Sequence, residues 1–199
     1  MAMCADFRFK AVILAAGSSL RMGTPKQLLK VQGSTMLDHA IRAALGAGLD
    51  PPVVVLGAHR EMILEGIKLA GSCEIVINRQ YGLGQASSLV AGVQHIMGSC
   101  DAAVFLLADQ PFVGAKLIAA MMGRFCESEA DLLYPTYKKQ RGNPVIIGKH
   151  LFPRLLTANG DAGARFLFND KTLNILAYTT KDKSVIVDID TPEDFQAHK

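Results

Sequence analysis

Short apolar runs alternate with segments of helical periodicity along almost the whole chain. The apolar runs contain few polar positions, as expected for strands of a sheet that is covered on both faces, and they lie at residues 11–15, 53–56, 74–77 and 102–108. Apolar residues spaced three and four apart predict helices between them, over residues 35–47, 61–69, 85–97 and 115–125. This alternation predicts an α/β fold with a mostly parallel, doubly wound sheet and right-handed crossovers.

The pattern changes after residue 130. Strands predicted at 131–134 and 144–147 are joined by an exposed turn at 138–142, so we expect one antiparallel strand in the sheet. Two short helical patterns, two strands and a final helix follow, at 150–157, 162–168, 174–178, 184–189 and from Thr191 onward. We expect the 199 residues to form a single domain, 1–199, with its core over about 10–196.

The composition argues against several classes of partner. The net charge is only +3 and the basic residues are dispersed, so the sequence lacks a basic patch of the kind that binds nucleic acid. Aromatic residues make up 7% of the chain and Trp is absent, which argues against a base-stacking platform. No apolar run approaches the roughly 18 residues of a membrane-spanning helix. We therefore expect neither nucleic acid nor a membrane as a partner.

The four cysteines allow two interpretations. Cys4, Cys73, Cys100 and Cys126 are far apart and form no C-x-x-C pair. They are either buried thiols of a reducing compartment or the two disulfides of a secreted fold. A glycine-rich α/β chain whose first residues do not resemble a signal peptide favours thiols and a cytoplasmic location.

The loop after the first strand has the composition of an anion-binding site. The apolar run over residues 11–15 breaks at Gly17, and a loop of small residues from Gly17 onward contains Arg21 and Lys26. Successive backbone N–H groups in such a loop bind anions, and Arg and Lys add charge-assisted donors for phosphate oxygens. The spacing matches neither a P-loop nor the G-x-G-x-x-G dinucleotide motif. The alternative is an ordinary solvated loop whose cations have no special role.

Acidic residues follow two of the predicted strands. Asp109 ends the most apolar strand, and Pro111 holds Gln110 extended, so no helix begins there. Ligands of open α/β sheets bind beyond the carboxyl ends of the strands, where Asp109 would lie near the opening loop. Asp109 is then either a solvated strand end or a ligand of Mg²⁺, which one or two carboxylates and phosphate oxygens usually hold.

The second acidic segment is Asp188-Ile-Asp-Thr-Pro-Glu-Asp194. Thr191, Pro192 and Asp194 have the residue types of an N-cap, a first helical position and an acidic N3 position. Asp188 and Asp190 are not explained by capping, and in a strand they would point to the same side. They are either solvated carboxylates or include a second metal ligand.

Several motifs together resemble a known family. The segment Leu14-Ala-Ala-Gly-Ser-Ser-Leu-Arg-Met-Gly-Thr-Pro-Lys26 resembles the signature of nucleotidyltransferases. Four further motifs narrow the resemblance to the MobA-like branch, and within it to the molybdenum cofactor (molybdopterin) cytidylyltransferases, the MocA-like proteins. They are Asn78…Gly84…Ser88-Leu89, Leu107-Ala-Asp-Gln-Pro111, Gly142-Asn-Pro144 and Asp188-Ile-Asp-Thr-Pro-Glu-Asp194.

The resemblance implies a Rossmann-like, three-layer α/β/α fold and a Mg²⁺-dependent transfer of a nucleoside monophosphate, with release of pyrophosphate. It implies that Lys26 contacts the α-phosphate, that Arg21 holds the β- and γ-phosphates, and that Asp109 and Asp190 carry Mg²⁺. Arg21, Lys26 and Asp109 would be the catalytic residues. The other nucleotide-binding positions would be Leu14, Ala15, Ala16, Gly17, Ser18, Ser19, Asn78, Gly84 and Ser88.

The base and the acceptor rest on finer detail of the same resemblance. Guanylyltransferases of this branch usually read Leu-Ala-Gly-Gly and carry Asp before the loop Lys, whereas this chain has Ala16 and Pro25, which favours CTP. The implied acceptor is molybdopterin or the molybdenum cofactor, contacted by Asn143 and Arg165, with a molybdenum hydroxylase as a further partner. The alternatives are another acceptor such as a sugar 1-phosphate, GTP as donor, or a non-catalytic nucleotide-binding accessory protein.

Overall fold

The computed structural model describes residues 6–18 and 23–198. Two of the predicted site residues, Ser19 and Arg21, lie outside the described residues.

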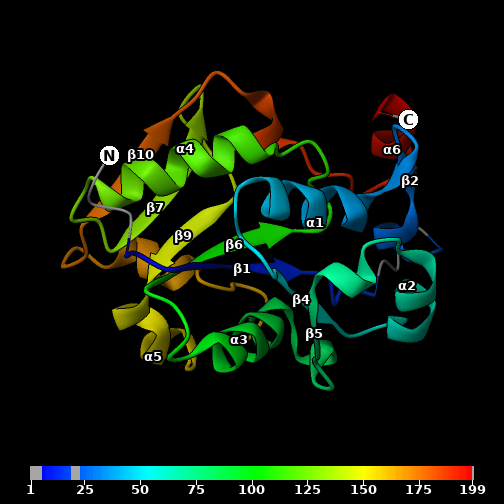
Figure 1. Cartoon of the computed structure of the whole chain (residues 1–199), viewed down its shortest axis with the longest axis horizontal. Coiled ribbons are helices and arrows are strands. Elements are labelled where there is room, and N and C mark those ends of the chain that lie inside the picture. Colours follow the sequence, from blue (N-terminus) through cyan, green and yellow to red (C-terminus); the bar gives the residue numbers. More distant parts are fainter. Residues whose placement is uncertain (1–5, 19–22, 199) are drawn as a thin grey trace.

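A mixed sheet forms the centre of the molecule (Figure 1). In spatial order its strands are β10 (Ile175–Thr179), β7 (Leu132–Tyr137), β9 (Val145–Gly148), β6 (Ala102–Leu107), β1 (Phe9–Leu14), β4 (Val53–Leu56) and β5 (Glu74–Ile77), and the short β8 (Gln140–Arg141) pairs with β7. Strand β9 runs antiparallel to both β6 and β7, whereas β6–β1, β1–β4, β4–β5 and β10–β7 are parallel pairs. The predicted fold class is confirmed, including the antiparallel strand.

Helices cover both faces of this sheet (Figure 1). Their bounds are α1 (Met36–Gly46), α2 (Arg60–Gly66), α3 (Gln85–Ile96), α4 (Ala115–Cys126), α5 (Phe152–Leu155) and α6 (Pro192–His198). Ala11 and Ile13 of β1 belong to the apolar cluster that contains residues of α1 and α4. Val12 points to the other face and packs with residues of α3 and α5. The continuous apolar run of β1 is thus explained by burial on both sides.

Helix α1 begins where the sequence provides a cap. The Thr35 hydroxyl accepts a hydrogen bond from Asp38 N at 3.0 Å, which satisfies one of the free donors of the first turn. The last helix begins in the same way, because Thr191 Oγ1 accepts from Asp194 N at 3.2 Å and Asp194 Oδ2 accepts from Thr191 N at 2.9 Å. The predicted cap of the final helix is confirmed.

The strand predicted at 184–189 is wrong. Residues Lys183–Ile186 form a short 3-10 helix, η8, whose first turn is capped by Asp182 Oδ1 at 2.9 Å from Ser184 N. The following residues cross the end of the sheet, and Ile189 N donates to the Asp109 carbonyl at 3.0 Å. The apolar residues that suggested a strand serve this crossing instead, since Val185 and Ile189 are fully buried. Asp188 and Asp190 therefore do not share one side of a strand.

The C-terminal segment packs beside the strands that follow the opening loop. Strands β2 (Lys30–Val31) and β3 (Ser34–Thr35) form a small hairpin. Val31 packs with Ile189 of the crossing segment and Phe195 of α6, and Figure 1 shows α6 beside β2. This contact places the acidic segment, residues 188–194, next to the segment between β1 and β2, which includes Lys26.

Cysteine chemistry differs from the expectation at one position. Cys73 and Cys100 are free thiols, but Cys126 is disulfide-bonded, so the expectation of thiols alone is wrong there. Burial raises the pKa of the Cys100 thiol. Within the described residues, no helix has the length and apolar character needed to cross a membrane.

Candidate active site

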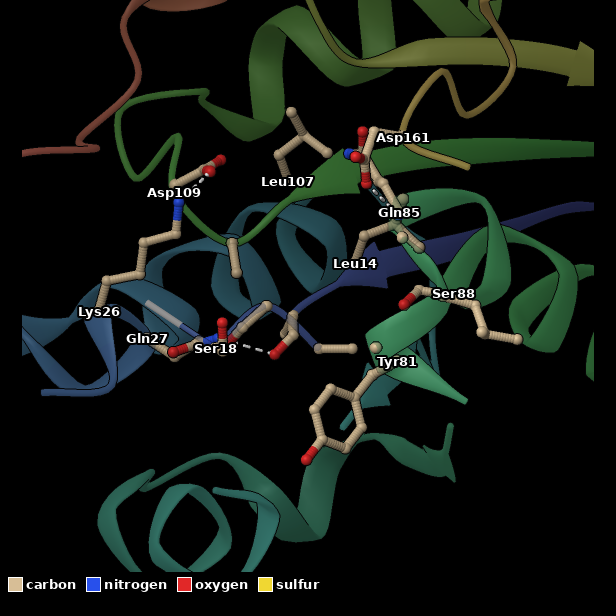
Figure 2. A pocket seen from close by; sticks show the side chains of 17 residues that line it. Leu14, Ser18, Lys26, Gln27, Tyr81, Gln85, Ser88, Leu107, Asp109 and Asp161 are labelled. Atoms are coloured by element: carbon tan, nitrogen blue, oxygen red, sulfur yellow. Dashed lines mark hydrogen bonds and ion pairs between the residues drawn. The ribbon is translucent and has the colours of Figure 1, made fainter. Parts of the chain in front are cut away.

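A cavity of about 590 Å³ opens where β1 and β6 end (Figure 2). One wall is the backbone that leaves β1, and another is the turn before α3. The cavity lies at the carboxyl ends of parallel strands, as open α/β sheets predict. Of the predicted site residues, those that line it are Leu14, Ala15, Ala16, Gly17, Ser18, Lys26, Gly84, Ser88 and Asp109.

The side chain of Gln27 holds the loop after β1 through two hydrogen bonds. This side chain is only 1% exposed, and its Nε2 donates to the carbonyl oxygens of Ala15 at 2.8 Å and Gly17 at 3.1 Å. Both carbonyls are thereby turned toward Gln27, which fixes the course of the loop beside the cavity. Sequence reasoning missed Gln27, since its only signal was a polar residue next to Lys26.

Lys26 joins the two acidic segments. Its ammonium lies 2.6 Å from Asp109 Oδ2 and 2.8 Å from Asp190 Oδ1, and Figure 2 shows the first of these contacts at the edge of the cavity. Burial alone would lower the pKa of Lys26, but the charge of Asp109 and hydrogen bonds to both carboxylates outweigh it and raise that pKa. The lysine is therefore a fixed positive charge within the site.

Asp188 and Asp190 have different partners. Gln110 Nε2 donates to Asp188 Oδ1 at 2.6 Å, whereas Asp190 faces Lys26. Burial raises the pKa of the Asp188 carboxyl, the Gln110 hydrogen bond opposes that rise, and the nearby Asp109 and Asp190 charges add to it. Gln110 was not predicted as a site residue, although it lies in the motif that contains Asp109.

The carboxylates fit a hard divalent cation. Asp109 Oδ1 is buried and has no hydrogen-bond partner within the part of the chain that the structure describes, so only one oxygen of this carboxylate is used by Lys26. No group of three His, Cys, Asp or Glu residues suited to a metal occurs among residues 6–18 and 23–198. A cation held by Asp109 and Asp190 would need phosphate oxygens or water to complete its shell, which is how Mg²⁺ is usually bound.

Asn78 lies behind the cavity wall rather than in it. Its Nδ2 donates to Ser87 Oγ at 2.8 Å and to Ser88 Oγ at 3.0 Å, and its Oδ1 accepts from Gln80 N at 2.8 Å. Ser88 lines the cavity and Asn78 does not. The structure thus places Asn78 as a buried support that orients Ser88.

Gly84 permits a close approach of two loops. Its φ is +98°, and a Cβ at this position would lie 2.6 Å from Asp161 Oδ1, so only glycine fits. Asp161 Oδ1 accepts from Gln85 N at 3.3 Å, and the Gly160 carbonyl accepts from Ala86 N at 3.0 Å. The first amides of α3 are therefore occupied by a loop from the C-terminal half, and Figure 2 shows Asp161 beside Gln85.

A second cavity of about 200 Å³ adjoins the first and shares Leu14, Gln85 and Leu107 with it. Asn143 and Arg165, the two predicted acceptor residues, both line this second cavity, which we call the acceptor cavity. Asn143 precedes a cis proline. The remaining lining combines the polar side chains of Gln85 and Arg141 with apolar ones, which include Leu89, Phe105, Val145, Ile147 and Phe168.

A cavity at the carboxyl ends of a doubly wound sheet, lined by the backbone that follows β1 and by a lysine and an aspartate in contact, is typical of nucleotidyltransferases. Residues 11–175 match the MobA-like NTP transferase domain, and the chain belongs to this family. It is 32% identical over 189 residues to nicotine blue oxidoreductase of Paenarthrobacter nicotinovorans and 30% identical over 194 residues to purine catabolism protein PucB of Bacillus subtilis, in each case over 92% of both chains.

Solved structures show the same fold. Rv0371c from Mycobacterium tuberculosis H37Rv is 26% identical, with a TM-score of 0.86 over 96% of this chain and 97% of that one. The same mycobacterial protein as a complex with manganese gives a TM-score of 0.82 at 23% identity.

Proposed function

We propose that the protein transfers CMP from CTP to the phosphate of molybdopterin or the molybdenum cofactor and releases pyrophosphate. One observation carries this proposal: Lys26 contacts both Asp109 and Asp190 at the edge of a cavity that shares three lining residues with a second cavity. A nucleotide in the first cavity and an acceptor in the second would adjoin, with the charged groups of phosphoryl chemistry beside the nucleotide.

The reaction needs position and charge more than proton transfer. An oxygen of the acceptor phosphate is already anionic, so it attacks the α-phosphorus without a general base, and the bond to pyrophosphate breaks. Lys26 would stabilise the charge that develops on the α-phosphate. Arg21 would hold the β- and γ-phosphates above the backbone of Gly17 and Ser18. These roles of Lys26 and Arg21 rest on the family resemblance and on the position of Lys26.

A divalent cation, which we take to be Mg²⁺, would be held by Asp109 and Asp190 and would neutralise phosphate charge. Asp109 is chosen because its Oδ1 has no hydrogen-bond partner among the described residues. Asp190 is chosen over Asp188 because Asp188 accepts a hydrogen bond from Gln110. The manganese complex of the mycobacterial neighbour is consistent with a divalent cation in this fold.

CTP is favoured by two residues of the opening loop. Ala16 is 4% exposed and lines the first cavity, in which we place the nucleotide. The guanylyltransferase pattern has glycine at this position. Pro25 precedes Lys26 at the start of η3 (Lys26–Leu28), where that pattern has aspartate. Ser88, oriented by Asn78, would face the base.

The lining of the acceptor cavity favours a ring system over a sugar. Its residues include two arginines and one asparagine but no carboxylate. A sugar would leave hydroxyl groups against the apolar surface of Leu89, Phe105 and Ile147, and unpaired polar groups are costly to bury. A flat heterocycle with an anionic group matches this lining better.

Release of pyrophosphate by the purified protein tests the proposal. Each of CTP, GTP, ATP and UTP is paired with the molybdenum cofactor, released from a molybdoenzyme, and with several sugar 1-phosphates. We expect release with CTP and the cofactor. Release with GTP but not CTP would overturn the assignment of CTP as the donor. Release only with sugar phosphates would overturn the assignment of the molybdenum cofactor as the acceptor.

The name of one relative raises a second candidate. Nicotine blue oxidoreductase, at 32% identity, is named for a redox reaction, although β1 of this chain is followed by Leu-Ala-Ala-Gly-Ser and not by the dinucleotide motif. Oxidation of NADH and NADPH in the presence of quinoid dyes, measured on the same preparation, separates the two. Redox turnover without any release of pyrophosphate would favour the second candidate.

A further inference from the structure

Three residues form the boundary between the two cavities. Leu14 ends β1, Leu107 ends β6 and Gln85 begins α3, and all three line both the first cavity, which we call the nucleotide cavity, and the acceptor cavity. Of the three, only Gln85 has a polar side chain. In Figure 2, Gln85 lies next to Asp161, on the opposite side of the cavity from Lys26. A molecule that extends from one cavity into the other therefore passes the Gln85 amide.

The backbone of Gln85 is fastened to a wall of the acceptor cavity. Its N–H donates to Asp161 Oδ1 at 3.3 Å, and the next amide, Ala86 N, donates to the Gly160 carbonyl at 3.0 Å. The loop that accepts both hydrogen bonds continues into residues 162–165, which line the acceptor cavity. These contacts hold the first turn of α3 against that wall.

The side chain of Gln85 reaches the same wall. Its Oε1 lies 3.8 Å from the point that a Cβ on Gly163 would occupy, and Gly163 lines the acceptor cavity. Within residues 6–18 and 23–198, the side-chain amide has no hydrogen-bond partner, because the hydrogen bonds of Gln85 come from its backbone. An amide offers one carbonyl acceptor and two N–H donors, which suits an uncharged polar group.

The position of Gln85 selects one part of the acceptor. Under the proposed function the acceptor phosphate lies beside Lys26, which lines only the nucleotide cavity, and the rest of the acceptor lies in the acceptor cavity. The boundary then meets the atoms that follow the phosphate. Because Gln85 is uncharged, it requires no second anionic group on the acceptor.

We propose that Gln85 is an acceptor-specificity residue, which hydrogen-bonds an uncharged polar group next to the attacking phosphate where the acceptor crosses from one cavity into the other. This proposal rests on the proposed function for the assignment of the two cavities. The group it recognises is an N–H, hydroxyl or ring oxygen of a neutral heterocycle. The ordinary role of a glutamine in the first turn of a helix, contact with solvent alone, would leave substrate binding unchanged.

Two variants and a matched control test the amide. Gln85→Met keeps an unbranched side chain of similar length without its donors and acceptor. Gln85→Glu keeps an acceptor, loses the donors and adds a negative charge near the acceptor phosphate. Gln94→Met is the control, because Gln94 is an exposed glutamine of the same helix that lines neither cavity.

Pyrophosphate release gives the first readout. For Gln85→Met we expect the KM for the molybdenum cofactor to rise about 5-fold, the scale of one neutral hydrogen bond, with the KM for CTP within about twofold of wild type. Gln85→Glu should raise the cofactor KM further, because its charge repels the phosphate. Gln94→Met should match wild type. An unchanged cofactor KM in Gln85→Met, or a rise confined to the KM for CTP, would overturn the proposal.

Binding without turnover gives the second readout. Molybdopterin, released anaerobically from a molybdoenzyme, is mixed with the protein in the absence of CTP, and the free fraction after ultrafiltration is converted to its fluorescent oxidation product. We expect Gln85→Met to bind it about 5-fold more weakly than wild type, and Gln94→Met to bind it equally. Equal binding by wild type and Gln85→Met would overturn the role of Gln85.

The two proposals fail in different ways. Release only with another acceptor, such as a sugar 1-phosphate, would overturn the molybdenum cofactor as the substrate, and the KM for that acceptor in Gln85→Met would then decide the role of Gln85. Wild-type turnover with an unchanged acceptor KM in Gln85→Met would count against Gln85 alone. Absence of both pyrophosphate release and molybdopterin binding would overturn the proposed function, and with it the assignment of the cavities on which the role of Gln85 rests.

Discussion

The ammonium of Lys26 lies 2.6 Å from Asp109 Oδ2, although 83 positions separate the two residues. Asp190 Oδ1 lies 2.8 Å from the same nitrogen. The lysine thus sits between the two carboxylates that we propose for a divalent cation, and the ammonium and that cation would be alternative partners of the same carboxylates. Binding of a cation with its nucleotide would free Lys26 to meet the α-phosphate.

Competition between lysine and metal gives a prediction for the protein without nucleotide. In Lys26→Met the two carboxylates lose their positive partner, so we expect Mn²⁺ to bind about 10-fold more tightly than to wild type, the scale of one charge-assisted hydrogen bond. The electron paramagnetic resonance signal of free Mn²⁺ measures this affinity. Lys30→Met is the control, since Lys30 is exposed on β2 and does not line the cavity. Unchanged or weaker binding of Mn²⁺ by Lys26→Met would contradict the competition.

The same lysine and its first partner should be needed for turnover. We expect Lys26→Met and Asp109→Asn each to lower kcat by about 10²-fold or more, as when one preorganised charge stabiliser is removed. Steady-state release of pyrophosphate with CTP and the molybdenum cofactor measures the effect. Lys30→Met should retain wild-type kcat. A wild-type rate in either site variant would show that its residue does not act in the reaction.

The support behind Ser88 gives a third prediction. Asn78→Ala removes the donor that Ser87 and Ser88 share and leaves the buried Ser88 hydroxyl without that partner. We expect the free energy of unfolding to fall by about 1–3 kcal/mol and the KM for CTP to rise several-fold, with a smaller change in the KM of the acceptor.

Urea denaturation and separate titrations of the two substrates measure these effects on Asn78→Ala. Asn159→Ala is the control, because Asn159 is an exposed asparagine on the neighbouring loop. Equal increases in both KM values would show a general loss of structure instead of a specific role at the base.

The sequence predicted the sheet well because burial on both faces leaves a local signal. The fully buried run Val53–Leu56 has the predicted bounds, and so does the edge strand Glu74–Ile77, whose residues are only partly buried. Thr191 caps its helix through a motif of four residues. The segment after Lys183 was misjudged because its apolar residues are buried by a crossing over the sheet edge, a tertiary contact that has the same apolar pattern as a strand.

The site was predictable only where one segment contains the whole signal. The loop from Gly17 to Lys26 has small residues and cations in sequence, and Asp109 marks a strand end. Gln27 has no such signal, because its role comes from the carbonyl oxygens of Ala15 and Gly17 that the fold brings to it. The hydrogen bond from Gln110 that gives Asp188 a different partner from Asp190 likewise could not be seen in the sequence.

The Asp170 carboxylate connects η7 (Arg165–Asn169), which lines the acceptor cavity, to α5, and its contribution to stability depends on pH. Asp170 follows η7, which contains Arg165 and Phe168. It accepts from Thr172 Oγ1 at 2.6 Å and Thr172 N at 2.9 Å, and its Oδ2 lies 2.7 Å from Arg154 of α5. The Thr172 hydrogen bonds, followed by the Arg154 contact, lower the pKa of Asp170 to about 2.

A lowered pKa fixes the direction of the pH dependence. The charged form of Asp170 is favoured by folding, so its stabilisation is complete above the unfolded pKa of about 3.9 and is lost as the pH falls toward about 2. Asp170→Asn lacks this titration. We therefore expect wild type to have the higher Tm at pH 5 to 7, and the difference from Asp170→Asn to shrink between about pH 4 and pH 2. Thermal unfolding at a series of pH values measures it, with Glu129→Gln as a control for loss of an exposed carboxylate. A difference in Tm that stays constant or grows as the pH falls would contradict the assignment.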